Sequence, residues 1–339
     1  MINISIIIPV FNSDKTLGKC ISSILISDRD DFEVVCVNDG STDTSRSICD
    51  TFALEDKRVK VYHRDNSGVS AARNFGMKVS QGETFMFVDS DDFLDPSFLN
   101  SNVLNRTFFD LIIFGLNEEY TYGKWNQHRY VETTFTEKDF LRFYESHLLG
   151  FAFWGPWAKV FKRSVIVEKN IQFDESMSLG EDTLFLLNYL KHIKNIHVSD
   201  NVAYNYCFVE KSLSKEQRLD WDELFLKKSF FEVDLLKVKY GNGLVFNQFL
   251  LLKYLNYLKL KLKHIYLLNE YSVAEKLLIL KSEKDLLFKI PVGLFDLLRT
   301  KMSLMKKIVV IFFRFAPSVS MLNILFVMVG SFLKRTRRL

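Results

Sequence analysis

The chain has 339 residues, of which 48% are hydrophobic and 25% charged, which indicates a packed protein of one large domain with an appendage or of two domains. The net charge of +4 is too small to indicate nucleic-acid binding, so we expect no nucleic-acid partner. Only 5 prolines and 14 glycines are present, which argues against long disordered linkers. The four cysteines show no paired short spacing and are expected to be reduced thiols of a cytosolic protein.

Strand patterns alternate with helix patterns in the first part of the chain. Short apolar runs predict strands at 4–10, 32–37, 59–63, 84–88 and 111–114. Helices are predicted after the first three strands, because capping residues or a glycine turn precede apolar periodicity there. This alternation predicts an α/β fold with a doubly wound, mostly parallel sheet. Met1 leads almost directly into the first strand, so we expect no secretory signal.

Three of the predicted strands end in polar residues, at 9–12, 39–43 and 89–92. In a parallel sheet these ends converge on one edge and form one crevice. The carboxylates of Asp89, Asp91 and Asp92 would repel each other without a cation, and such hard oxygen ligands suit Mn²⁺ or Mg²⁺. The alternative is a turn in which Asp92 or Asp95 caps a helix beginning near Pro96, and for Asp92 itself we favour the cap. Neither a glycine-rich dinucleotide loop nor a P-loop lysine follows the first strand.

Four segments together carry a resemblance to a known family: Ser-Ile-Ile-Ile-Pro-Val-Phe-Asn, Val-Asn-Asp-Gly-Ser-Thr-Asp, Asn-Ser-Gly-Val-Ser-Ala-Ala-Arg-Asn and Phe-Val-Asp-Ser-Asp-Asp. In this order and spacing they resemble the inverting family-2 glycosyltransferases of bacterial polysaccharide type, whose fold is called GT-A. Trp157-Ala158-Lys159 and Gly180-Glu181-Asp182-Thr183-Leu184-Phe185 resemble the acceptor-side motifs of that family. The resemblance extends over about residues 3–215.

The resemblance implies that eight residues bind the nucleotide-sugar: Pro9, Val10, Phe11, Asp39, Asn66, Arg73, Asp89 and Ser90. It also implies that Asp91 binds the metal, which is Mn²⁺ or Mg²⁺. The alternatives are purely structural roles, in which Asp39 caps the helix that follows it and Arg73 is a surface arginine paired with Asp65.

The same resemblance makes Asp182 the general base, with Glu181 as its partner. The alternative is that both acids only stabilise a helix N-terminus, where the helix dipole favours negative charge. Trp154, Trp157 and Lys159 are expected on the acceptor side, although tryptophans in a chain with 32 phenylalanines are more often core residues.

The composition changes after residue 218, which gives three expected regions. Residues 1–218 form the GT-A-like nucleotide-sugar-binding and catalytic domain. Residues 219–300 read as a basic amphipathic helical region, and 301–339 as an apolar, basic-flanked, membrane-associating tail. Whether 308–333 spans the membrane, lies on it or packs in an oligomer stays open at this point.

These observations predict a metal-dependent, inverting glycosyltransferase of hexosyltransferase type. The expected donor is a nucleotide-diphosphate sugar, with uridine as the favoured base, and the expected acceptor is a hydroxyl of a lipid-linked saccharide in surface polysaccharide or capsule synthesis. The expected location is the cytoplasmic face of the cell membrane, peripheral or monotopic, and homo-oligomers are not excluded. Two alternatives remain: a protein O-glycosyltransferase, and a non-catalytic nucleotide-sugar-binding scaffold of a polysaccharide assembly complex.

Overall fold

The computed structural model describes residues 2–96, 98–99, 104, 108–148, 150, 153–177, 180–208, 219–241, 244–267, 272–288 and 290. Its contacts divide the chain into two compact units, Met1–Phe143 with Gly150–Lys215, and Tyr144–Leu149 with Glu216–Leu339. We describe each unit by itself.

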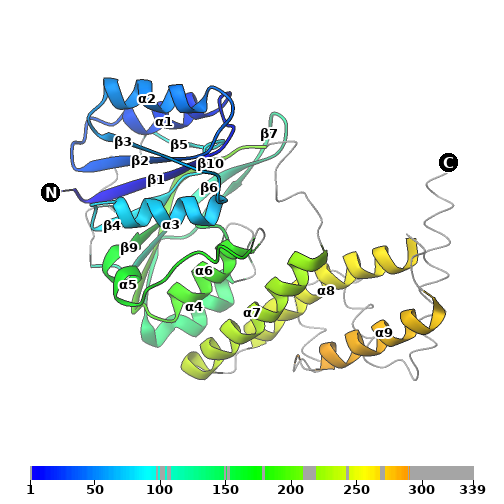
Figure 1. The fold of residues 1–339 in the computed structure, drawn as a ribbon. Helices are drawn as coiled ribbons and strands as arrows, with labels where there is room; N and C mark the ends of the chain where they lie inside the picture. The colour runs from blue at the N-terminus through cyan, green and yellow to red at the C-terminus, as the bar shows by residue number, and fades with distance from the viewer. Residues whose placement is uncertain are drawn as a thin grey trace. The chain divides into compact units, whose positions relative to one another are not determined.

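The first unit begins with four parallel strands, β1 (Ile4–Val10), β2 (Phe32–Asp39), β3 (Val59–Arg64) and β4 (Thr84–Phe87). They lie in the order β3-β2-β1-β4. Helices α1 (Leu17–Leu25) and α2 (Ser45–Glu55) cover one face of this sheet, and α3 (Val69–Val79) covers the other (Figure 1). All residues of β1 and β2 are buried, as expected for strands covered on both faces.

The second half of this unit extends the same sheet through the order β9-β6-β10-β5. Its strands are β5 (Phe93–Leu94), β6 (Leu111–Thr121), β7 (Lys124–His128), β8 (Thr133–Thr136), β9 (Lys159–Lys162) and β10 (Asn195–Tyr206). Its helices are η2 (Glu137–Asp139), α5 (Arg163–Glu168) and α6 (Glu181–Leu190), and α4 (Phe140–His147) begins in this unit and continues into the second from Tyr144. Strand β10 is parallel to β6, whereas β9 is antiparallel to both β4 and β6. The expected α/β fold with a large, mostly parallel sheet is therefore confirmed, with antiparallel strands added in its second half.

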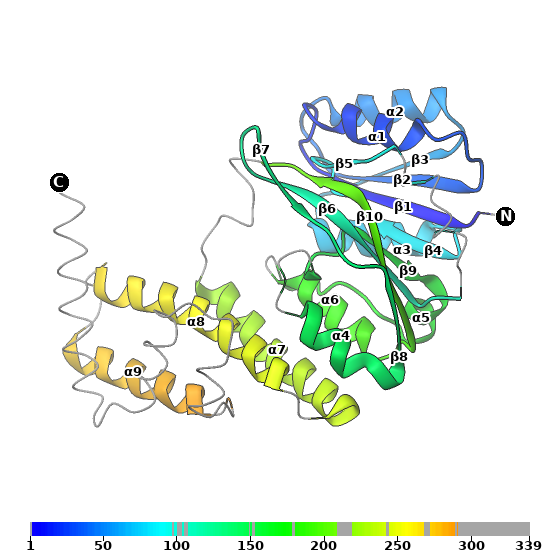
Figure 2. The ribbon, with the colours of Figure 1, turned by 180° about the vertical axis from the view of Figure 1, so that it is seen from behind.

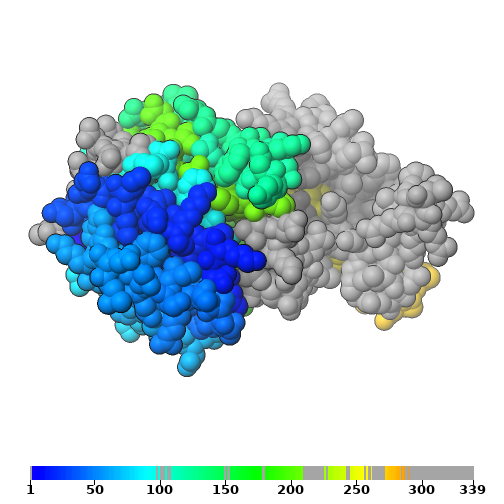
Figure 3. All heavy atoms as spheres, turned by 90° about the horizontal axis from the view of Figure 1, so that it is seen from above, coloured from blue at the N-terminus to red at the C-terminus, as the bar shows by residue number. Residues whose placement is uncertain are grey.

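Strands β6 and β7 form a hairpin beside β10, at the margin of the sheet (Figure 2). The view from above in Figure 3 shows the residues of this hairpin on the molecular surface of the first unit. Several of its large side chains are exposed, namely Tyr120, Tyr122 and Trp125.

Helix α3 lies very close to β1, because a glycine faces the strand. A Cβ at Gly76 would lie 2.4 Å from Cγ2 of Ile7, which is far inside the normal contact distance. Glycine at this position therefore sets the spacing between α3 and the sheet. Arg73 lies about one turn earlier on the same helix, so this spacing also fixes how deep the arginine reaches.

The chain after Asp92 differs from the expectation. A short strand, β5, follows directly, and its Phe93 and Leu94 pair with Asn205 and Tyr204 of β10. Asp92 consequently does not cap a helix beginning near Pro96, because its carboxylate turns toward β10 instead.

The second unit contains three long helices, α7 (Leu219–Tyr240), α8 (Leu244–Leu267) and α9 (Val273–Phe288). Glu283 of α9 is buried and accepts hydrogen bonds from Tyr257 and Lys261 of α8, which ties these two helices together. On α7, Phe231, Leu235 and Val238 are exposed, and their spacing places them on one side of the helix.

Among the helices that the structure describes, none combines the length and the apolar character needed to cross a membrane. The apolar tail expected at 301–339 lies outside the described residues.

Candidate active site

The ends of β1 and β4 meet at one edge of the sheet through a pair of serines. Pro9 and Val10 are the last residues of β1 and are buried, whereas Phe11, just beyond the strand, is 50% exposed. The hydroxyl oxygens of Ser13 and Ser90 lie 2.7 Å apart, so they share a hydrogen bond. The expected convergence of the strand ends is therefore seen in the structure.

The carboxylate of Asp39 at the end of β2 holds the turn that precedes α3. It accepts hydrogen bonds from the backbone N–H groups of Ser67, at 3.1 Å, and Gly68, at 2.7 Å. Gly40 has a φ of +74°, and a Cβ there would meet the backbone nitrogen of Asn66 at 2.8 Å. Asp39 thus binds the start of α3 rather than the start of α2, and Asn66 is exposed on the same turn.

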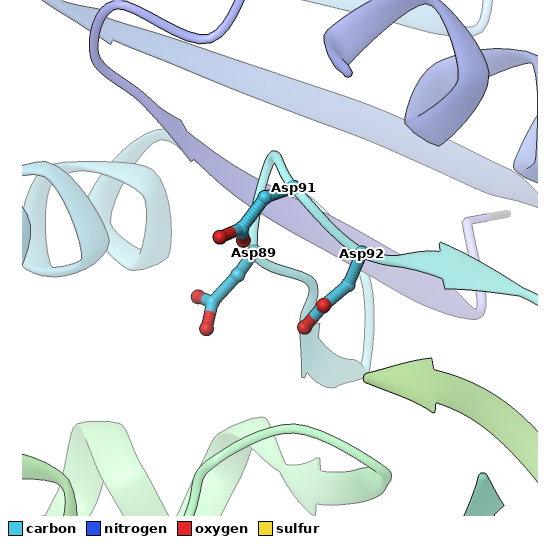
Figure 4. Close-up of side chains that lie close together, drawn as sticks. All are labelled: Asp89, Asp91 and Asp92. Carbon is cyan, nitrogen blue, oxygen red and sulfur yellow. The ribbon is translucent and has the colours of Figure 1, made fainter. Parts of the chain in front are cut away.

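Three aspartates gather where β4 ends (Figure 4). Asp89, Asp91 and Asp92 each offer a carboxylate oxygen, and these oxygens lie within 4.8 Å of one another. Asp92 accepts a hydrogen bond from the hydroxyl of Tyr204 at 2.6 Å and another from the backbone N–H of Cys207 at 2.7 Å. The Tyr204 hydroxyl in turn accepts a hydrogen bond from the backbone N–H of Asp89. The end of β10 therefore holds the aspartate cluster in place.

This cluster carries more negative charge than its surroundings neutralise. Burial, followed by the charge of Asp89, raises the pKa of Asp91 to about 6. Burial and the two neighbouring aspartates also raise the pKa of Asp92. In the part of the chain that the structure describes, no side chain donates a hydrogen bond to the carboxylate of Asp91. A set of three closely spaced carboxylate oxygens fits a hard divalent cation.

Arg73 joins the aspartate cluster to the start of α6. Its Nη2 donates to Oδ1 of Asp89 at 2.8 Å, and its Nη1 donates to Oδ1 of Asp182 at 2.7 Å. Oε1 of Glu181 lies 3.6 Å from the same Nη1. Arg73 is 3% exposed; burial disfavours its charge, but the three surrounding acids hold the pKa of the guanidinium above its usual value. The arginine therefore belongs to the site and does not form a surface pair with Asp65.

Glu181 and Asp182 occupy the first turn of α6, directly after Gly180, whose φ is +84°. Burial raises the pKa of Asp182 well above the usual range, and the charge of Arg73 counteracts this shift. Burial likewise raises the pKa of Glu181. The first turn of α6 therefore places two acids of raised pKa beside one buried guanidinium.

The three residues expected on the acceptor side lie in the loop before β9 and at its start. Trp157 is buried and stacks on the ring of Tyr204, at a centroid distance of 5.9 Å. Trp154 is half-buried and contacts Phe153 edge-on. Lys159 is fully buried, and its Nζ donates to the backbone carbonyls of Gly155 and Trp157. Burial lowers the pKa of Lys159 to about 7.

Sequence reasoning missed the parts of the site that come from distant segments. The partnership of Tyr204 with Asp92 spans 112 positions of the chain, and that of Ser13 with Ser90 spans 77. A tyrosine near the end of a strand is common and carries no spacing signal. The adjacent polar ends of the strands are a hint of these contacts, because the ends of parallel strands meet at one edge of the sheet.

Comparison with known proteins identifies the type of domain. Residues 5–163 match the sequence profile of the family described as glycosyl transferase family 2. The uncharacterized glycosyltransferase EpsJ of Bacillus subtilis is 26% identical over 60% of this chain and 60% of its own length. A poly(ribitol-phosphate) beta-glucosyltransferase of Bacillus spizizenii is 31% identical over 60% of this chain and 32% of its own length. The chain thus spans less than two thirds of these relatives.

Solved structures support the fold. The structure of Staphylococcus aureus TarS 1–349 in complex with UDP-GlcNAc aligns with a TM-score of 0.69 and 19% identity, covering 99% of this chain and 92% of that one. At this level of identity the likeness concerns the fold alone. Together with the sequence match, it shows that residues 5–163 of this chain are a glycosyl transferase family 2 domain in a GT-A-like fold.

Proposed function

We propose that the chain is an inverting glycosyltransferase that moves a sugar from a nucleotide-diphosphate donor to a hydroxyl of a saccharide acceptor. The observation that carries this proposal is the Arg73 bridge. One guanidinium contacts Asp89 at the end of β4 and Asp182 at the start of α6. A base and a donor-binding acid are thereby held on the two sides of one arginine.

The donor is proposed to bind across the ends of β1, β2 and β4. The buried backbone of Pro9 and Val10 and the exposed ring of Phe11 border the place of the base. Carboxylate oxygens of Asp39 and Asp89 accept hydrogen bonds from base and ribose groups, and Asn66 and Ser90 complete this side of the crevice. The similarly folded TarS was solved with UDP-GlcNAc, which supports a uridine donor.

Asp89, Asp91 and Asp92 would hold Mn²⁺ or Mg²⁺. Such an ion supplies positive charge against the developing charge of the leaving diphosphate. Tyr204 and the backbone of Cys207 keep Asp92 in its orientation, so that the cluster is preformed.

In the proposed transfer, Asp182 accepts the proton of the acceptor hydroxyl as the oxygen attacks the anomeric carbon. The new bond joins that carbon to the acceptor oxygen, the bond to the donor phosphate breaks, and the nucleoside diphosphate leaves with its electron pair. A single displacement of this kind inverts the configuration and needs only one base on the attacking side. Arg73 and Glu181 act as positioning residues that set the charge and orientation of Asp182.

We further propose that the acceptor is lipid-linked and that the chain works at the cytoplasmic membrane surface, in surface polysaccharide synthesis. The exposed side of α7 formed by Phe231, Leu235 and Val238 supports this location. Apolar side chains on a helix with several lysines suit the interface of an anionic membrane. In this proposal residues 1–218 are catalytic, and 219–300 together with the tail at 301–339 provide attachment.

The test is release of nucleoside diphosphate from a panel of sugar nucleotides, with Mn²⁺, with Mg²⁺ or with a chelator. We expect metal-dependent release from one donor, and its loss in Asp91→Asn. Asp182→Asn should bind nucleotide like the native chain in calorimetry but lose transfer to acceptor. Near-native turnover by Asp182→Asn would rule out the base, and unchanged Mn²⁺-dependent nucleotide binding by Asp91→Asn would rule out its metal role.

The same experiment separates the alternatives. Nucleotide binding without turnover on any acceptor would favour the scaffold. Transfer to a protein hydroxyl by a chain that does not associate with membranes would favour the protein O-glycosyltransferase.

A further inference from the structure

Strands β5, β10, β6 and β7 present a row of side chains that the site described above does not use. Asn205 pairs with Phe93 on one side and with Asn117 on the other, and Asn117 pairs with Gln127. Directly paired residues point to the same face of a sheet. Trp125 lies two positions from Gln127 on β7 and therefore shares that face. We call these five residues the amide face.

The amides of this face form a directed chain of hydrogen bonds. Nε2 of Gln127 donates to Oδ1 of Asn117 at 2.9 Å, and Nδ2 of Asn117 donates to Oδ1 of Asn205 at 2.9 Å. Nδ2 of Asn205 donates to the carbonyl of Phe93 at 3.3 Å. Each amide nitrogen carries two hydrogens, and each donates only one of them in this series of hydrogen bonds. The planar groups are thus fixed in orientation and retain capacity for further hydrogen bonds.

Two aromatic rings stand beside the amides. Phe93 and Trp125 meet edge-on with ring centroids 6.4 Å apart. Trp125 is 43% exposed, and Nζ of Lys19 lies 3.4 Å from the centroid of Phe93. An exposed indole held beside oriented amides offers a flat apolar surface next to hydrogen-bonding groups.

We infer that the amide face binds the saccharide chain of the acceptor, beyond the sugar that receives the transferred unit. A pyranose has an apolar C–H face, which stacks on an indole, and a rim of hydroxyls, which pair with side-chain amides. A lipid surface would leave the amides without partners. The inference rests on the proposed function, because the bound saccharide is an acceptor only if the chain transfers a sugar to it.

The location of the face fits this use. Phe93 directly follows Asp92 in the chain. Asn205 directly follows Tyr204, whose hydroxyl binds the Asp92 carboxylate. The amide face therefore adjoins the aspartate cluster along the chain, while Asn205 and Tyr204 point to opposite faces of β10. A bound oligosaccharide would lead away from that cluster along the β6–β7 hairpin.

The test measures saccharide binding without any donor. A panel of neutral oligosaccharides, from disaccharides to octasaccharides of glucose, galactose, N-acetylglucosamine and N-acetylgalactosamine, is titrated into the full chain and followed by indole fluorescence and saturation-transfer NMR. We expect at least one member to bind, longer members to bind more tightly, and Trp125→Ala to weaken binding about tenfold, which equals ~1.4 kcal/mol. Trp125→Tyr should recover part of the affinity, because it restores an aromatic surface.

Gln127 and Asn126 provide a matched pair of amides on one strand. Asn126 pairs with Glu118 and lies on the opposite face. Gln127→Ala should weaken saccharide binding, whereas Asn126→Ala should not. UDP binding by calorimetry should stay unchanged in all these variants, which shows that they fold.

Two results would overturn the inference: binding of no panel member by the native chain, or equal binding by the native chain, Trp125→Ala and Gln127→Ala. Loss of anionic-vesicle binding in Trp125→Ala, without loss of saccharide binding, would instead identify the face as a membrane contact. None of these results bears on the proposed transfer reaction, because UDP binding and turnover are measured separately.

Discussion

Arg73 illustrates how much of this site depends on single side chains. The arginine is nearly inaccessible to solvent and lies among Asp89, Glu181 and Asp182. Removing one partner of a buried ion pair typically costs ~3–5 kcal/mol, because the remaining charge stays buried without compensation. The charge of Asp182 therefore depends on Arg73 more than on any feature of its own helix.

We predict that Arg73→Gln raises the pKa of Asp182 and lowers turnover by at least about tenfold. A carboxylate without its cation needs a higher pH to lose its proton. The low-pH limb of the activity profile should therefore move upward. Arg73→Lys keeps the charge but cannot make the bidentate contact of a guanidinium. The low-pH limb of its activity profile should therefore lie between those of the native chain and of Arg73→Gln. A native-like pH profile in Arg73→Gln would contradict the prediction, with thermal unfolding as the control for folding.

Lys159 gives a second prediction, on stability. Its pKa falls from an ordinary 10.5 to about 7 on folding, chiefly because of burial. Between these values the unfolded chain binds more protons than the folded one, so this group makes the protein more stable as the pH rises. The contribution is complete above 10.5 and is lost as the pH falls to about 7.

Urea unfolding of the native chain and of Lys159→Met at several pH values in this window checks the prediction. As the pH rises, the free energy of unfolding of the native chain should increase relative to that of the variant. Parallel curves would show that the ammonium is not desolvated in the folded state.

At the scale of elements, helix α3 packs closely against strand β1 because residue 76 is a glycine without a side chain. We predict that Gly76→Ala lowers the free energy of unfolding by ~1–3 kcal/mol, because the added methyl group overlaps Ile7. Gly18→Ala on α1 is the matched control, since a Cβ there meets nothing within 4 Å. It should be neutral or stabilising by ~0.5–1 kcal/mol, because alanine favours helix. Equal effects of the two substitutions in urea unfolding would disprove the close approach.

The elements also show what the sequence could predict. The four parallel strands were predictable, because each is a continuous apolar run between turn residues. Strands β7 and β8 were not, since they are short, largely exposed and polar. The cap expected at Asp92 was wrong, because its carboxylate binds Tyr204 and Cys207 at the end of β10 instead. The acids of the site could be named from the resemblance, but the Arg73 bridge between them required the structure.

At the scale of the whole molecule, the proposed attachment to a membrane can be tested. The exposed apolar side of α7 is the part of this proposal that the described residues offer for a test. We predict that the double variant Phe231→Asp, Val238→Asp binds anionic vesicles at least about tenfold more weakly than the native chain, because it puts charge where the apolar face would be buried. Leu54→Asp, at an exposed position of α2, is the control and should bind normally. Equal sedimentation of all three proteins with vesicles would exclude α7 from the contact.

The shared guanidinium has one more consequence. Because Asp89 and Asp182 draw on the same cation, the two acids are thermodynamically coupled, and the coupling is reciprocal. A ligand that satisfies Asp89 by other means leaves Arg73 to Asp182 and lowers its proton affinity. Conversely, a proton on Asp182 leaves Arg73 to Asp89 and makes that carboxylate a weaker acceptor for any ligand. Occupancy at one end of the arginine is thus communicated to the other end without movement of the backbone, and it would be observed as proton release on ligand binding.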